Sequence, residues 1–379
     1  MSPSTSHLLE ALNAGNPSRA VLSTAGEDRG LADQIRFPFL AIVGQADMKL
    51  ALILTLINRR VGGVLLIGPR GTGKTTAVRG LVDLMPLVER STCSNGCEPG
   101  ATVLGADAIC PNCAEKLEQG QKITKLDRMR LLELPLNARL EDVVGGINER
   151  IALEQQRIRL ERGVLSLADR NLLYIDEVNL LDNAIIDAIL DAAAQGIYTV
   201  RRGPLTATYR ARLTLVGTMN PEEGRLRPQL QDRFGLRVVV RGLREPEERL
   251  EIYRRSLAYQ TDPHAFVLQW TQDIAIAADE IAEAKERLPQ VTFADGVEFE
   301  GLRWIDRLGI DSHRAELTLF EAARAHAAAD ARIEATLDDL RAVAPLALRH
   351  RRSKFMDDYF QGQEEEEAEI EAVVNGAQT

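Results

Sequence analysis

The sequence predicts an α/β domain with a parallel central sheet, followed by a smaller, all-helical domain. From about residue 37 to residue 243, short apolar runs alternate with helical patterns, as a parallel sheet covered by helices requires. Each apolar run ends where a polar or glycine-rich motif begins, and open α/β sheets place their ligands at that edge. After residue 243 only helical patterns follow, which predicts a helical lid domain over residues 244–356.

Several runs have the length and composition of buried strands or of helices. The strands are expected at Val64–Ile67, Leu172–Ile175, 213–216 and 236–240, and the helices at 75–85, 246–258, 273–287 and 314–332. All expected strands fall before residue 243, so the α/β domain is assigned to residues 37–243.

The composition is that of a globular protein without a membrane segment. Apolar residues make up 45% of the 379 residues, charged residues 27% and aromatic residues only 4%, which favours an α/β or helical protein over an all-β one. No apolar run reaches the roughly 18 residues of a membrane span. Positions 1–19 lack the charged and apolar regions of a signal peptide, so we expect a cytoplasmic protein. A basic stripe that would indicate nucleic-acid binding is missing as well.

The two ends differ in composition from the domains. Residues 1–36 are rich in Ser, Gly and Asn without a clear period, and we expect a mobile leader. Residues 357–379 contain eight acidic and no basic residues, and therefore carry most of the net charge of −10. Such a composition is typical of a solvated, disordered tail. A docking tail for a basic partner is the alternative.

One segment matches the phosphate-binding loop GxxxxGK[ST] in full. It follows an apolar run, opens a helical pattern and consists of Gly68, Pro69, Arg70, Gly71, Thr72, Gly73, Lys74 and Thr75. The glycines let backbone N–H groups surround the phosphates of ATP. Lys74 is expected on the β- and γ-phosphate oxygens, and the Thr75 hydroxyl is expected to ligate Mg²⁺. A glycine-rich turn without a ligand would not account for this lysine and threonine.

Two carboxylates, Asp176 and Glu177, end the apolar run Leu172–Ile175. We expect Asp176 to hold Mg²⁺ through water and Glu177 to polarise the attacking water as a general base. A pair of acidic residues at a strand end is otherwise a turn or a helix cap. After a complete phosphate loop the pair favours an ATPase over a GTPase or a phosphate-binding kinase.

Two more polar residues follow the third expected strand. Asn220 is expected at the tip of that strand, where it would sense the γ-phosphate, and a simple turn before Pro221 is the alternative. Arg233 lies on a polar segment at the domain edge. From there it would act in trans, on the nucleotide bound to a neighbouring subunit. The alternative for Arg233 is a surface ion pair with Asp232.

In the helical domain, Arg314 lies at the start of an expected helix that Asp311 or Ser312 would cap. We expect Arg314 to reach back over the phosphates and to report the state of the nucleotide to the lid.

Longer stretches of the chain resemble the ATPase (I) subunit of magnesium chelatase, a member of the AAA+ superfamily of P-loop NTPases. The stretches are residues 134–136, 141–146, 178–182, 217–224, 226–235, 314–317 and 348–351, so that the likeness spans about residues 37 to 352. Asn-Pro-Glu-Glu-Gly and Arg-Pro-Gln-Leu within them are more specific than a phosphate loop alone.

The resemblance implies a hexameric ring that hydrolyses ATP, with an insertion near residues 143–162 and a β-hairpin near residues 198–209. It also implies the roles given above for Lys74, Thr75, Asp176, Glu177, Asn220, Arg233 and Arg314. The implied partners are a second AAA+ subunit with an integrin-like domain and a large porphyrin-binding subunit. Together, a complex of this family inserts Mg²⁺ into protoporphyrin IX, a ligase-type step of (bacterio)chlorophyll synthesis for photosynthesis. No tetrapyrrole pocket is expected in this chain.

All four cysteines fall in one insertion at about residues 91–115, and this is a departure from the family pattern. They are Cys93, Cys97, Cys110 and Cys113. Two pairs of thiolates suit a structural, tetrahedral Zn²⁺. An iron–sulfur cluster and redox or unpaired thiols are the alternatives, whereas disulfides are disfavoured in a reducing cytoplasm.

The insertion leaves a second function open, that of a MoxR-type AAA+ chaperone that remodels or metal-loads a partner with a von Willebrand-like domain. Such a protein would share every nucleotide-site residue named above. A DNA-directed motor would need a helix-turn-helix or a basic pore pattern, and the sequence shows neither. A ring without catalysis is disfavoured because all the hydrolytic residues are present.

Overall fold

The computed structural model describes residues 35–93, 97–98, 110–146, 161–203, 205–224 and 226–351. Nearly all of the expected leader, most of the expected insertion at 143–162 and the whole acidic tail lie outside the described residues. Within them, the helices lack the length and apolar character that crossing a membrane would require.

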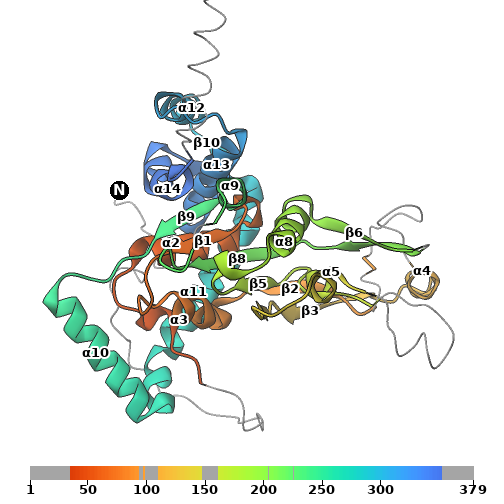
Figure 1. The fold of residues 1–379 in the computed structure, drawn as a ribbon, viewed down its shortest axis with the longest axis horizontal. Helices are drawn as coiled ribbons and strands as arrows, with labels where there is room; N and C mark the ends of the chain where they lie inside the picture. The colour runs from red at the N-terminus through yellow and green to blue at the C-terminus, as the bar shows by residue number, and fades with distance from the viewer. Residues whose placement is uncertain are drawn as a thin grey trace, which may run out of the picture.

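Five parallel strands form the central sheet, in the order β4–β5–β8–β1–β9 (Figure 1). They are β1 (Val64–Ile67), β4 (Leu131–Leu134), β5 (Leu172–Ile175), β8 (Thr214–Met219) and β9 (Leu236–Val239). The predicted α/β class with a parallel sheet is therefore confirmed. Strand β4 was not predicted, because this edge strand is only partly buried and carries a charged residue, Glu133. Strand β8 extends three residues beyond the expected 213–216, up to Met219.

Each face of the sheet is covered by helices, and the strands supply alternate side chains to the two faces. Val64, Leu66 and Tyr174 belong to a core shared with α2 (Ala46–Ile57) and α11 (Pro263–Arg287). Their chain neighbours, such as Leu65 and Ile175, pack with α8 (Asn183–Gln195) on the other face. Helix α8 is well defined at both ends, because the Asp182 side chain accepts a hydrogen bond from the Ala184 N–H, and Gly196 ends the helix at φ 73°.

The other helices that precede α11 are short, with one exception. They are α3 (Lys74–Gly80), α5 (Leu140–Val144), α7 (Val164–Leu167), α9 (Pro228–Arg233) and the longer α10 (Pro246–Thr261). The helix expected at 75–85 is instead α3 followed by a 3₁₀ turn, Leu81–Leu84. Helix α10 contains no buried residue and lies apart from the sheet at the lower left of Figure 1.

Two antiparallel ribbons flank the sheet. Strands β2 (Leu87–Ser91) and β3 (Thr124–Arg128) form one, and β6 (Ile197–Arg202) and β7 (Leu205–Arg210) form the other. The second ribbon is the hairpin expected near residues 198–209. Strand β6 and the short helix α4 (Pro111–Glu118), which carries Cys113, extend away from the sheet toward the right of Figure 1.

The C-terminal part consists of α12 (Val297–Arg307), α13 (His313–Ala329) and α14 (Leu337–Leu348), which lie above the sheet in Figure 1. It is not purely helical as predicted, since β10 (Thr292–Phe293) and β11 (Glu334–Ala335) form a two-residue parallel pair. The apolar side chains of α13 and α14 belong to the same core as α2 and α11. The C-terminal part and the sheet therefore share one continuous core in the described residues.

Candidate functional site

The phosphate loop joins β1 to α3 at the carboxyl ends of the strands, as predicted. Gly71 and Gly73 adopt φ angles of 77° and 85°, a region that favours glycine. Gly68 is required for space, because a Cβ there would lie 2.1 Å from the carbonyl oxygen of Val240. Lys74 is 8% exposed, and its Nζ donates hydrogen bonds to the carbonyl oxygens of Gly68 and Pro69 at 2.6 and 2.8 Å.

The electrostatic environment of Lys74 combines burial with neighbouring acids. Burial lowers the pKa of Lys74, whereas the charges of Asp176, Glu177 and Glu223 act in the opposite direction. The Lys74 ammonium group therefore lies close enough to interact electrostatically with Asp176, the predicted magnesium ligand, and with Glu177, the predicted base.

The two expected magnesium ligands lie side by side. The Thr75 Oγ1 is 3.4 and 3.5 Å from the two carboxylate oxygens of Asp176. These are the hard oxygen donors that Mg²⁺ prefers, so the residues fit the ion. Two residues that were not predicted from the sequence hold Thr75 and Asp176 in place. The Thr218 hydroxyl donates to Asp176 at 2.5 Å, and the buried Tyr174 hydroxyl donates to Thr75 at 3.2 Å. Both lie two residues before a predicted site residue, so the strand period of two could have indicated them.

Glu177 follows Asp176 in a left-handed conformation, with φ 52°, and its N–H donates to the Thr218 hydroxyl at 3.0 Å. Its carboxylate is 3.5 Å from the Arg70 guanidinium, which also pairs with Glu223. Arg70 is 73% exposed on its side chain, so this contact leaves the Glu177 carboxylate reachable from solvent.

Asn220 follows β8 and is 3% exposed. Its Oδ1 accepts a hydrogen bond from the Glu222 N–H at 3.3 Å, which is the turn considered as the alternative in the sequence. Its backbone carbonyl accepts from the Asn179 Nδ2 at 3.4 Å. The Asn220 side chain therefore stabilises a turn. The residue directly follows β8, the neighbour of the strand that leads into the phosphate loop.

A cavity of about 620 Å³ lies beside the phosphate loop, a volume suited to a nucleotide. It is bounded by residues 71–73 and 75–76, by the segment 41–43 and by one side of α10, which contributes Ile252 and Tyr259. The sequence analysis placed α10 in the lid and missed these wall residues. They reach the site because one side of α10 borders the cavity, although the helix buries none of its residues.

The predicted arginines lie at the opposite edge of the sheet, before the strands begin. Arg233 ends α9 and pairs with Asp191 and Asp187 of α8, at 2.7 and 3.3 Å. The ion pair with Asp232 that the sequence offered as the alternative is therefore not formed. Asp232 pairs instead with the buried Arg237 and Arg351, at 3.0 and 2.8 Å.

Arg314 corrects a sequence expectation. It lies near the start of α13, where its guanidinium is 3.6 Å from Asp232, and it lines a cavity together with Arg233. That cavity also includes Gly62 and Gly63, which precede β1, whereas the phosphate loop follows β1. Arg314 therefore does not reach back over the phosphate loop of its own chain. Ser312 is the N-cap residue of α13, but its side chain makes no capping hydrogen bond.

The four cysteines come together although they derive from separate segments. Their sulfur atoms all lie within 4.8 Å of one another, and the Cys93 and Cys110 Sγ atoms are 3.6 Å apart. That spacing is too long for a disulfide and close to the roughly 3.8 Å edge of a zinc tetrahedron with Zn–S bonds of about 2.3 Å. Beside the cluster, the Glu98 carboxylate pairs with Arg170, Arg210 and Arg212, which fixes the cysteine segment to the sheet.

Two family models match parts of the chain. The model described as an MCM P-loop domain matches residues 149–235, and the model described as an AAA lid domain matches residues 307–373. Each covers less than half of the chain.

Two curated relatives match over most of their length. The "Magnesium-chelatase subunit ChlI homolog" of Methanocaldococcus jannaschii is 42% identical over 320 residues, covering 84% of this chain and 86% of the relative. The "Magnesium-chelatase 38 kDa subunit" of Acidiphilium rubrum is 40% identical over 316 residues, covering 83% and 90%. Among solved structures, a putative ATPase from Cytophaga hutchinsonii is similar in fold, with a TM-score of 0.51, 19% identity, and coverage of 82% of this chain and 83% of that one.

Proposed function

Since the chain belongs to the family of magnesium-chelatase ATPase subunits, we propose that it is the ATP-hydrolysing AAA+ motor of a magnesium chelatase. In this role it drives the insertion of Mg²⁺ into protoporphyrin IX by partner subunits in (bacterio)chlorophyll synthesis. We call the end of the sheet that carries the phosphate loop, Asp176, Glu177 and Asn220 the nucleotide edge. The observation that carries the proposal is that this edge is intact in a chain that aligns with such subunits over more than four fifths of its length.

The residues at the nucleotide edge divide the work of hydrolysis. Lys74 would exchange its carbonyl contacts for the β- and γ-phosphate oxygens. Thr75 and Asp176 would hold Mg²⁺, which would neutralise phosphate charge. Glu177 accepts the proton of the attacking water. Asn220 lies at the tip of the neighbouring strand and orients groups near the γ-phosphate.

Arg233 and Arg314 act on the nucleotide of a neighbouring subunit in a ring, which we take to be a hexamer. Both lie at the edge of the sheet opposite the phosphate loop, so neither serves the nucleotide of its own chain. A ring that places this edge against the next phosphate loop gives each site arginines in trans.

The partners are a second AAA+ subunit with an integrin-like domain and a porphyrin-binding subunit. In this proposal the porphyrin step belongs to these partners.

The proposal is tested by substituting this chain for the ATPase subunit in a reconstituted magnesium chelatase and following the fluorescence of Mg-protoporphyrin. We expect a signal that requires ATP and disappears with Lys74→Ala. Glu222→Gln, an exposed acid next to the site, is the matched control and keeps the signal. A chain that hydrolyses ATP but gives no signal with several chelatase partners contradicts the chelatase role while leaving the ATPase intact.

The MoxR-type alternative gains no support, because the two curated relatives described above carry chelatase names. The archaeal relative is named only a homolog of the subunit, which makes the porphyrin assay the decisive one.

The cysteine cluster holds a structural zinc ion in the proposed motor. Four thiolates at tetrahedral spacing are the donor set that Zn²⁺ prefers, and the chain has no other cysteine. Elemental analysis should find about one zinc per chain, and Cys113→Ser should abolish it. Iron with the visible absorbance of a cluster, or four freely titrating thiols and no metal, would contradict zinc.

A further inference from the structure

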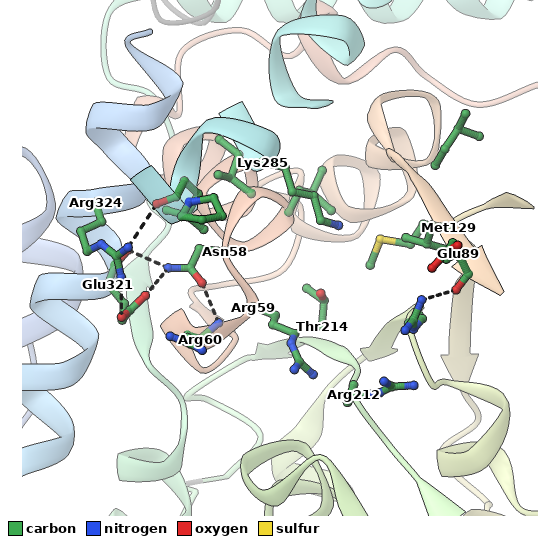
Figure 2. Close-up of a pocket in the computed structure, with 17 residues that line it drawn as sticks. Asn58, Arg59, Arg60, Glu89, Met129, Arg212, Thr214, Lys285, Glu321 and Arg324 are labelled. Carbon is green, nitrogen blue, oxygen red and sulfur yellow. Dashed lines mark hydrogen bonds and ion pairs between the residues drawn. The ribbon is translucent and has the colours of Figure 1, made fainter. Parts of the chain in front are cut away.

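A second cavity, of about 550 Å³, lies at the edge of the sheet opposite the nucleotide. Figure 2 shows its lining. Asn58, Arg59 and Arg60 come from the chain just before β1, and Arg212 and Thr214 from the start of β8. Strand β1 spans about 13 Å at 3.3 Å per residue, and the cavity and the phosphate loop lie at its opposite ends.

The cavity is strongly basic. Six cationic side chains line it and only two acidic ones do: the cations are Arg59, Arg60, Arg170, Arg212, Lys285 and Arg324, and the acids are Glu89 and Glu321. They derive from segments more than two hundred residues apart, so no local motif in the sequence shows the cluster.

Three of the six cations already have partners. Arg170 and Arg212 pair with Glu98, at 2.7 and 2.5 Å, and Arg324 pairs with Glu321 at 3.1 Å. Arg59, Arg60 and Lys285 have no carboxylate partner among the residues that the structure describes.

Burial and the excess of positive charge lower the pKa values of two of these cations. Burial, and then repulsion by Arg59 and Arg170, lower the pKa of Lys285. Burial and repulsion, with Arg212 the leading charge, also lower the pKa of Arg59 despite the opposing charge of Asp169. A negatively charged ligand would relieve this repulsion.

One wall of the cavity is rigid and the other is apolar. The Asn58 amide donates to the Glu321 carboxylate at 2.6 Å, and its Oδ1 accepts from the Arg60 N–H at 3.0 Å, which fixes the turn that carries Arg59 and Arg60. Leu56, Met129 and Leu288 line the apolar side. The cavity is therefore a preformed, concave site with convergent cations, the arrangement expected of a small-molecule site.

We propose that this cavity binds a small molecule bearing a chain of phosphate groups, with Arg59, Arg60 and Lys285 as its direct ligands. Arginine and lysine side chains make charge-assisted hydrogen bonds to phosphate oxygens, and three unpaired cations suit a polyanion better than a single carboxylate. The site goes beyond the proposed function, because the hydrolysed nucleotide lies at the other edge. Arg59 and Arg60 also line the cavity of Arg233 and Arg314, so a bound anion would be adjacent to the arginines that act in trans.

The test is isothermal titration calorimetry with tripolyphosphate on the full chain carrying Lys74→Ala, which weakens binding at the phosphate loop. We expect one saturable site per chain, and Lys285→Ala or Arg59→Ala in that background should weaken it at least about tenfold. Arg303→Ala, the removal of an exposed arginine on α12, is the control and should leave the affinity unchanged. A parallel titration with ATP distinguishes the sources: tighter binding of ATP indicates a second nucleotide, and equal binding indicates that the phosphate chain alone is recognised.

Two outcomes overturn the site. One is the absence of saturable binding, and the other is binding that Lys285→Ala and Arg59→Ala leave unchanged. If the same two variants instead weaken ring assembly while tripolyphosphate does not bind, the cations contact an acidic face of the next subunit.

Discussion

The two edges of the central sheet carry different kinds of site. At the nucleotide edge, the phosphate loop, the Asp176–Glu177 pair and Asn220 each directly follow a strand. At the opposite edge, which we call the arginine edge, seven arginines come from loops and helices far apart in the sequence. They are Arg59, Arg60, Arg170, Arg212, Arg233, Arg314 and Arg324.

The difference shows how one subunit can serve two roles. In the proposed function the nucleotide edge supplies oxygen ligands and a base, whereas the arginine edge supplies positive charge to the nucleotide of the neighbouring subunit. Because parallel strands carry the two sets at opposite ends, one chain cannot bring both to the same nucleotide, and a ring can.

The largest effect is expected for Arg233→Ala. Removing the arginine that we propose to stabilise transition-state charge in trans should lower ATP hydrolysis by about 10³- to 10⁵-fold. Mixing this variant with Lys74→Ala subunits should restore part of the activity, because an intact phosphate loop of one then meets the intact Arg233 of the other. Phosphate release from defined mixtures measures the recovery.

Asp191→Asn is the matched control, since it removes the ion-pair partner of Arg233 but keeps the arginine. It should retain hydrolysis. Mixtures that show no recovery, in rings that assemble normally, would place Arg233 on the nucleotide of its own chain and remove the division between the edges.

The next effect, of about 10²- to 10⁴-fold, is expected for Glu177→Gln. The amide cannot accept the proton of water, but the contacts of Lys74, Thr75 and Asp176 with the nucleotide remain. Turnover should therefore stop while binding of a fluorescent ATP analogue is unchanged. Normal steady-state hydrolysis would show that the base is another residue.

The sequence predicted the nucleotide edge far better than the arginine edge. Each nucleotide motif is contiguous with a buried, apolar strand, so local pattern was enough to place Asp176 and Asn220 directly after β5 and β8. The position of Arg314 depends on how α13 packs against α2, α11 and α14, and local pattern says nothing about that. For the same reason the sequence missed the walls of the nucleotide cavity on α10 and the strand β4, which is half-exposed at the sheet edge.

A moderate loss of stability is expected for Glu98→Gln, which tests the link between the cysteine cluster and the arginine edge. The carboxylate is 21% exposed and pairs with Arg170, Arg210 and Arg212, so the change should cost about 2 kcal/mol of unfolding free energy. Urea unfolding with zinc present measures it. A loss below about 0.5 kcal/mol would show that the cysteine segment is held by other contacts.

The pH dependence of this effect follows from the pKa of Glu98. Burial opposes ionisation, but hydrogen bonds and charges of Arg212, Arg170 and Arg210 outweigh it and lower the pKa below its ordinary value. A lowered folded-state pKa contributes stability above the unfolded value of about 4.3, and this contribution is lost as the pH falls further. The two proteins should therefore differ at neutral pH and converge below about pH 4.

The smallest effect is expected for Tyr174→Phe at the nucleotide edge. Burial raises the pKa of Tyr174, so its hydroxyl stays a donor to Thr75 at 3.2 Å. Losing this one hydrogen bond should cost about 1 kcal/mol, or about fivefold in the Mg²⁺ concentration needed for half-maximal hydrolysis. The maximal rate should hardly change, because Glu177 and the arginines in trans are untouched. An equal fall of the rate at every Mg²⁺ concentration would mean that Tyr174 acts on the reaction itself and not by positioning a magnesium ligand.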